Sequence, residues 1–172
     1  EFWQSVDHPI FGDYLVPSGP IQFGDKNRGE PAASPLIGQH TSEILEEISK
    51  DVSTPSCSSD STSTPTLPFD GLRAIDMTQV WAGPYGGRFL ADMGADVIRI
   101  DRPNPSPLEG DASSDINRRS RRSVTLNLKT SEGREAALKL IGEADALIEG
   151  YRPGVMERLG LSPDACLERN PK

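Results

Sequence analysis

Apolar residues in the second half of the chain follow two different spacings in turn. Four short apolar runs indicate buried strands, at residues 72–77, 96–100, 123–127 and 146–148. Between them, apolar residues recur every three or four positions, which predicts helices at residues 83–93 and 131–144. Pro153 suits the first position of a further short helix at residues 153–158, where its missing N–H costs nothing. Strands that alternate with helices are typical of parallel strands joined by right-handed crossovers. The sequence therefore predicts an α/β fold, part of a doubly wound parallel (Rossmann-like) sheet.

Residues 1–52 show a weaker pattern, with short extended pieces followed by one helix. Tyr14–Val16 and Ile21–Phe23 are brief strand candidates, separated by proline and glycine. A helix is predicted to open at residues 40–43, with Thr41 or Ser42 as its cap. Its apolar stripe consists of Ile44, Leu45 and Ile48. Because this stripe is too narrow to form a core, we expect the helix to dock on another part of the chain.

A compositional boundary separates these two parts. From Ser53 to Thr66, twelve of fourteen residues are serine, threonine or proline, with no apolar period. Such a segment buries too little apolar surface to offset the entropy of ordering it. We therefore expect a flexible, protease-sensitive linker with a span of about 20 Å. The alternative, a glycosylated stalk, would require a secreted protein.

Charge and composition exclude several classes of function. The net charge is −8, of which residues 1–65 carry −7, so no nucleic-acid partner is expected. No apolar run is long enough to cross a membrane, and no signal peptide is visible at the start. Cys57 and Cys166 stand in unlike contexts, which favours a reducing, cytoplasmic location. His8 and His40 have no companions at metal-ligand spacing, so no metal is predicted.

The carboxyl ends of the predicted strands carry the most chemistry. Parallel strands bring these ends to one edge of the sheet, where open α/β sheets bind ligands. Three of the four ends deliver a cation, from Arg102, Lys129 and Arg152. Trp81 and Tyr151 add aromatic rings. Guanidinium groups bind phosphate oxygens in pairs, and rings stack on bases, so this edge suits a phosphorylated nucleotide. The alternative is that these are ordinary solvated surface charges.

Two further features admit a functional and a structural interpretation. The loop Gly83–Gly87 and the acid Asp101 suggest a dinucleotide site, but the G-x-G-x-x-G pattern is absent and Pro84 removes a backbone donor. A non-catalytic or NAD-binding α/β module therefore stays a minor alternative. The basic run Arg118–Arg122 is expected to be a solvated connection before a strand, with phosphate steering as the alternative.

Several motifs, in order, resemble class III CoA-transferases of the CaiB/BaiF type. Residues 67–172 carry DGLRAIDMTQVWAGP, LADMGADVIRIDRP, RRSVTLNLKTSEGRE and ADALIEGYRPGVMERLGL, which are similar to the start of that family. Residues 1–52, through VDHPIFGDY and SPLIGQHTSEILEEI, resemble the end of the same family. A tail that precedes a head implies a junction piece of two fused copies: a tail at 1–52, a linker at 53–66 and a CoA-binding α/β portion at 67–172.

The resemblance implies transfer of CoA from an acyl-CoA to a carboxylic acid, through intermediates on an aspartate. That aspartate would lie beyond Lys172, so no catalytic residue is expected in this chain, and the chain alone is expected to be inactive. Members of the family pair as interlocked dimers, so the partner would be the rest of the enzyme or a second copy. The positions that match CoA contacts are Trp81, Ala82, Arg102, Leu126, Asn127, Leu128, Lys129, Gly150, Tyr151, Arg152 and Arg158.

Two positions depart from the formyl-CoA transferases within this family. Those enzymes have glutamine at the position of Trp81 and asparagine at the position of Gly150. Both departures argue against formate or oxalate as the substrate. Racemization of 2-methylacyl-CoA thioesters, or a lyase reaction, therefore stays open as an alternative activity.

Overall fold

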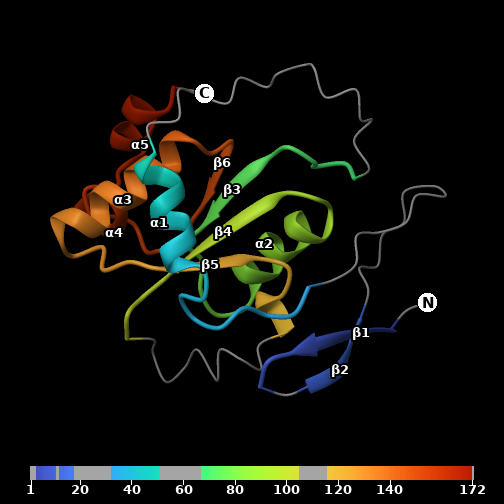
Figure 1. The fold of residues 1–172 in the computed structure, drawn as a ribbon. Coiled ribbons are helices and arrows are strands. Elements are labelled where there is room, and N and C mark those ends of the chain that lie inside the picture. Colours follow the sequence, from blue (N-terminus) through green and yellow to red (C-terminus); the bar gives the residue numbers. More distant parts are fainter. Residues whose placement is uncertain (1–2, 11, 18–31, 51–66, 105–115, 172) are drawn as a thin grey trace.

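The structure is a computed structural model that describes residues 3–10, 12–17, 32–50, 67–104 and 116–171. Its centre is a sheet of four parallel strands: β3 (Arg73–Asp76), β4 (Asp96–Asp101), β5 (Arg122–Thr125) and β6 (Ala146–Ile148). The strand order is β5-β4-β3-β6 (Figure 1). The predicted parallel α/β fold is confirmed. The predictions for Ile21–Phe23 and for residues 53–66 lie outside the described residues.

Helices cover both faces of this sheet. The helices are α1 (Thr41–Ser49), α2 (Ala82–Asp92), α3 (Ser131–Gly142), α4 (Val155–Arg158) and α5 (Pro163–Arg169). The main apolar core joins strand residues Ile75, Ile98 and Val124 to α1, α3 and α5. On the other face, a smaller cluster around Ala74 and Val97 packs with residues of α2 (Figure 1). Because strand side chains alternate, one face of each strand therefore serves each layer.

The cap of α1 differs from the prediction. The N-cap is His40, and no side chain caps the helix. The Thr41 hydroxyl instead accepts a hydrogen bond from the backbone N–H of Thr125, at 3.0 Å. Ile44 and Ile48 are buried as predicted, but Leu45 is 37% exposed. The helix does dock on the rest of the chain, as expected, against β5 and α3.

One strand and one α-helix of the described residues were not predicted. β1 (Trp3–His8) pairs in antiparallel register with β2 (Gly12–Pro17), so only the second strand of this hairpin was found from the sequence. The inward positions of β1 are Val6 and His8, one apolar and one polar, which gives no apolar alternation. The helix α5 does carry a signal, because Ser162 caps it and Pro163 opens it.

The basic run before β5 is buried, so the prediction of a solvated connection was wrong. It begins in a 3-10 helix, Ile116–Arg118. Arg119 is 1% exposed and donates to Asp92 at 2.7 Å. Arg121 and its partner Asp76 are both fully buried. Each of these two guanidinium groups therefore pairs with an aspartate on the α2 face of the sheet, and neither is placed to bind a ligand.

Among the residues that the structure describes, there is no helix whose length and apolar character would allow it to span a membrane.

Candidate functional site: the carboxyl edge of the sheet

The parallel topology brings the predicted residues to one edge. The loops that follow the four strands begin at Met77, Arg102, Leu126 and Glu149. Backbone bonds extend the pairing just past the strands: Leu126 N–H donates to Asp101 at 3.0 Å, and Met77 N–H donates to Ile148 at 2.8 Å. We call the four loops that begin at these residues, together with the first residue of α2, the carboxyl rim. The rim contains every predicted site residue except Arg158, which lies at the end of α4.

Asp76, the last residue of β3, holds the loop that follows this strand. One carboxylate oxygen of Asp76 accepts from both the backbone N–H and the hydroxyl of Thr78, and the other accepts from Arg121. Gly83 then packs so tightly on Thr78 that a Cβ there would lie 2.3 Å from the threonine side chain. Asp76 and Thr78 were not among the predicted site residues, although an aspartate at a strand end can accept a hydrogen bond from the backbone two residues on, which is a turn signal.

This loop presents apolar side chains to solvent. Val80 has a left-handed backbone (φ 72°), which is uncommon for a β-branched residue. Val80 is 68% exposed and Trp81, the next residue, is 67% exposed. Tyr85 lies one turn further along α2, and the guanidinium of Arg88 stacks on its ring at 4.6 Å. Trp81 and Ala82, which begin α2, are therefore accessible to a ligand.

Arg102 is the cation at the end of β4. Its side chain is exposed and donates to Gln79 of the neighbouring loop, at 3.0 Å. This bond links the loops after β3 and β4, and it holds the guanidinium beside Gln79. Gln79 was not among the predicted site residues, and its local sequence gives no signal for this role.

The loop after β5 divides into two kinds of residue. Leu126 is buried in the core and Leu128 packs against it, so their side chains serve the fold rather than a ligand. Asn127 and Lys129 are exposed, and Asn127 accepts from the backbone N–H of Lys129 at 3.2 Å. Thr130 then caps α3 by accepting from Gly133 at 3.1 Å.

Beside β6 the rim opens into a hollow of about 350 Å³. Tyr151 and Arg152 line it, together with Glu149, Met156, Glu157 and Cys166 among others. Glu149 accepts from the backbone N–H of Tyr151 at 2.7 Å, which fixes the turn that follows Gly150. Arg158 does not line the hollow; it folds back over Gly154, with Nη1 3.2 Å from where a Cβ would stand. Within the described residues, no group of three or more His, Cys, Asp or Glu could hold a metal ion.

Comparison with known proteins decides the family. Residues 69–172 match the model of CoA-transferase family III. The chain belongs to this family. It is 39% identical over 126 residues to a probable fatty acyl-CoA transferase, Rv3272, of Mycobacterium tuberculosis, covering 64% of this chain and 31% of that protein. A crystal structure of Rv3272 superposes with a TM-score of 0.58 at 40% identity, covering 63% of this chain and 32% of that one.

Two other family relatives differ in length. The succinyl-CoA:mesaconate CoA-transferase of Haloarcula marismortui is 40% identical over 116 residues, which are 59% of this chain and 29% of that protein. The CoA-transferase/lyase DddD of a Marinomonas strain is 42% identical over 106 residues, which are 62% of this chain but only 12% of that protein. This chain therefore spans about a third of the length of Rv3272 and of the Haloarcula enzyme. DddD is more than twice as long as either of these two proteins.

Proposed function

We propose that the complete protein transfers coenzyme A from an acyl-CoA to a carboxylic acid, and that the carboxyl rim binds the nucleotide half of CoA. The observation that carries this proposal is the position of Arg102, an exposed guanidinium oriented by Gln79 at the carboxyl end of β4. Lys129 follows β5, the strand next to β4, and Arg152 follows β6 at the other side of the sheet, both at the same carboxyl end. Charge-assisted bonds to phosphate are strong, and an open α/β sheet binds ligands at this end.

The aspartates at the carboxyl rim bear on where the nucleophile of the reaction comes from. A covalent relay on an aspartate would require a carboxylate that can reach the thioester. The aspartates at the ends of β3 and β4 cannot do this, because Asp76 and Asp101 are buried and bonded to arginines. As the resemblance to the family implies, we propose that the nucleophile comes from outside this chain, and that the chain alone has no transferase activity. Trp81 and Ala82 would lie near the thioester, at the exposed start of α2.

We further propose that the chain is a junction between two copies of the family. The resemblance of residues 1–52 to a family tail motivates this proposal, together with the relative DddD, whose length leaves room for more than one copy. Sequencing the complete reading frame would decide it: a second set of the motifs of residues 70–161 must precede residue 1.

Titration of the complete protein with CoA tests the rim. Arg102→Ala should weaken CoA binding by about tenfold to a hundredfold, since a charge-assisted bond is worth about 1.5–3 kcal/mol. Arg169→Ala is the matched control, because Arg169 lies on α5 and pairs with Glu135 at the surface. Added salt should narrow the difference between Arg102→Ala and the wild type. Equal affinities of the two variants by calorimetry would refute the assignment of the rim to CoA.

A further inference from the structure

Residues 32–50 lie against the α/β part of the chain, and we call them the docking segment; residues 67–171 are the α/β unit. The segment forms hydrogen bonds along the outer edge of β5. Ser123 N–H donates to His40 Nδ1 at 3.1 Å, and Ser123 C=O accepts from the backbone N–H of His40 at 3.0 Å. Two residues on, Thr125 N–H donates to the Thr41 hydroxyl. An edge strand otherwise exposes these groups to other chains, so the segment occupies a site that would attract a partner.

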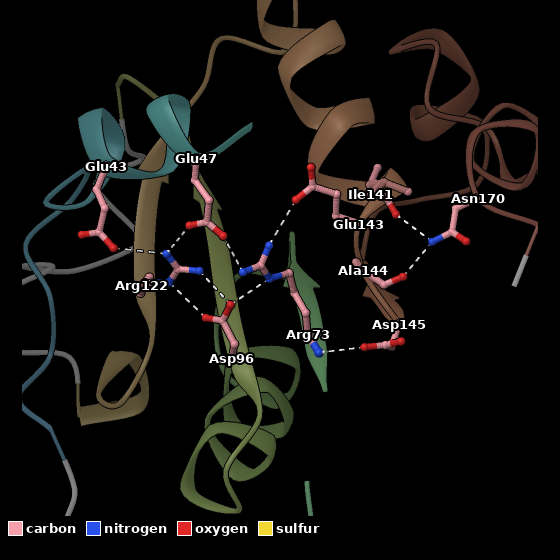
Figure 2. Close-up of polar contacts among 10 residues, drawn as sticks. All are labelled: Glu43, Glu47, Arg73, Asp96, Arg122, Ile141, Glu143, Ala144, Asp145 and Asn170. Carbon is pink, nitrogen blue, oxygen red and sulfur yellow. Dashed lines mark hydrogen bonds and ion pairs between the residues drawn. The ribbon is translucent and has the colours of Figure 1, made fainter. Parts of the chain in front are cut away.

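Opposite charges form the second part of the interface. Glu47 of α1 lies between two arginines of the α/β unit, 2.5 Å from Arg73 and 2.8 Å from Arg122 (Figure 2). The same two arginines both bind Asp96, at 2.8 and 2.7 Å. Burial by itself would raise the pKa of Glu47, but hydrogen bonds from Arg122 and Arg73 lower it on balance. Glu47 thus completes a charge cluster that the α/β unit begins.

Apolar burial is the third part. Ile44 is fully buried and Ile48 is 8% exposed, and both belong to the main core with Val124 and Leu140. Burial of apolar side chains such as these stabilises the contact between the segment and the unit. Edge pairing, charge and apolar contact therefore meet within ten residues of the segment, between His40 and Ser49. None of these contacts depends on a continuous backbone between the segment and the unit.

We propose that the α/β unit recognises the docking segment as a non-covalent partner and keeps it when the chain between residues 51 and 66 is cut. The partner that this surface fits is a turn with side-chain acceptors, as in His40-Thr41, followed by an amphipathic helix that places one acid beside Arg73 and Arg122. In the longer protein, this interface attaches the part of the chain that ends at residue 50 to the α/β unit that follows residue 66. The proposal is independent of the CoA assignment, because the segment contacts the outer edge of β5 and the amino ends of β3 and β4 rather than the exposed residues of the carboxyl rim.

Cleavage of the intact chain tests this directly. A single protease site placed within residues 53–66 allows the purified, folded 172-residue protein to be cut once. We expect the two pieces to elute together from a sizing column at micromolar concentration and to separate only in denaturant. Separation of the pieces under native conditions, whether or not the larger piece stays folded, would overturn the proposal.

Two neighbouring glutamates provide the matched variants. Glu47→Gln removes the charge between the arginines, whereas Glu46→Gln affects only an exposed pair with Lys50. In the cleaved protein, we expect Glu47→Gln to raise the dissociation constant about fivefold to tenfold, allowing for partial solvent screening of the pair. Glu46→Gln should leave it unchanged, and added salt should narrow the gap. If both variants behaved alike, specific recognition through Glu47 would be refuted.

Discussion

Arg121 and Asp76 form an ion pair in which both side chains are fully buried. The pair lies under the loop that presents Trp81, since Asp76 also binds Thr78. Arg121 is tied in addition to the backbone carbonyl of Asn117. The pair thus joins the end of β3 to the segment before β5, across a sequence separation of 45 residues. Its role is to fix the base of the rim loop.

Asp76→Asn should therefore destabilise the protein strongly. Removing one partner of a buried pair leaves an uncompensated charge, at a typical cost of about 3–5 kcal/mol. Urea unfolding of the intact chain measures this, with Glu168→Gln on the exposed surface of α5 as a control that should change little. Replacing both partners, as Asp76→Leu with Arg121→Met, should be less damaging than Asp76→Asn alone. A single variant as stable as the control would contradict this account.

Two adjacent glycines of α2 should respond in opposite directions to alanine. A Cβ on Gly87 would lie 2.4 Å from the carboxylate of Asp76, whereas a Cβ on Gly86 would meet nothing within 4 Å. Gly87→Ala should lose about 1–3 kcal/mol through overpacking. Gly86→Ala should gain up to about 1 kcal/mol, because alanine favours the helix. Thermal unfolding of both variants checks the difference, and a gain in Gly87→Ala would show that the helix can shift away from the ion pair.

The contact between His40 and Ser123 should make the docking segment sensitive to pH. Burial lowers the pKa of His40; nearby Arg122 lowers it further, and Glu43 opposes the shift. Because Nδ1 accepts the Ser123 N–H, a proton on that nitrogen would remove the bond. The folded state thus disfavours protonation. Its stability is complete above the ordinary histidine pKa of about 6.5 and declines as the pH falls below it.

Unfolding between pH 5.5 and 7.5 measures this effect, with the ordinary histidine pKa of about 6.5 inside the range. His40→Asn is the matched control, since its side-chain oxygen can accept the same bond but does not titrate. The difference in stability between the wild type and His40→Asn should change across this range. A difference that stays constant with pH would exclude His40 as the titrating group.

Asn170 should contribute to stability through the end of α3. Its side-chain amide donates to the carbonyls of Ile141 and Ala144, at 3.0 and 2.7 Å (Figure 2). The Ile141 carbonyl, in the last turn of α3, also accepts from the backbone N–H of Ala144, whereas Ala144 lies past the end of the helix, where carbonyls lack intrahelical donors. Asn170→Ala should cost about 1–3 kcal/mol, because a buried acceptor is left without its bond. Glu168→Ala, exposed on the preceding turn, should be near neutral. Equal melting temperatures of the two variants would refute this role for Asn170.

The position of Arg102 shows how much of the site local sequence can predict. An apolar run followed by Asp101 and Arg102 is enough to end a strand and place a cation beyond it. The rule that parallel strands end at one edge then gathers Arg102, Lys129 and Arg152 without any knowledge of strand order. The bond from Arg102 to Gln79 could not be predicted, because it depends on β3 and β4 being neighbours.

The four strands, their parallel arrangement and the helices between most of them could be predicted from the residues alone, because these features depend on spacings of two to four residues. The strand order and the partners of the polar residues depend instead on contacts between distant parts of the chain. The run Arg118–Arg122 was predicted to be solvated, yet it pairs with aspartates that lie 27 and 45 residues away. Likewise, Thr41 caps no helix, since its hydroxyl serves an edge strand 84 residues later. A polar side chain can be satisfied equally well by water, by its own backbone or by a distant partner, and only the folded arrangement selects among these.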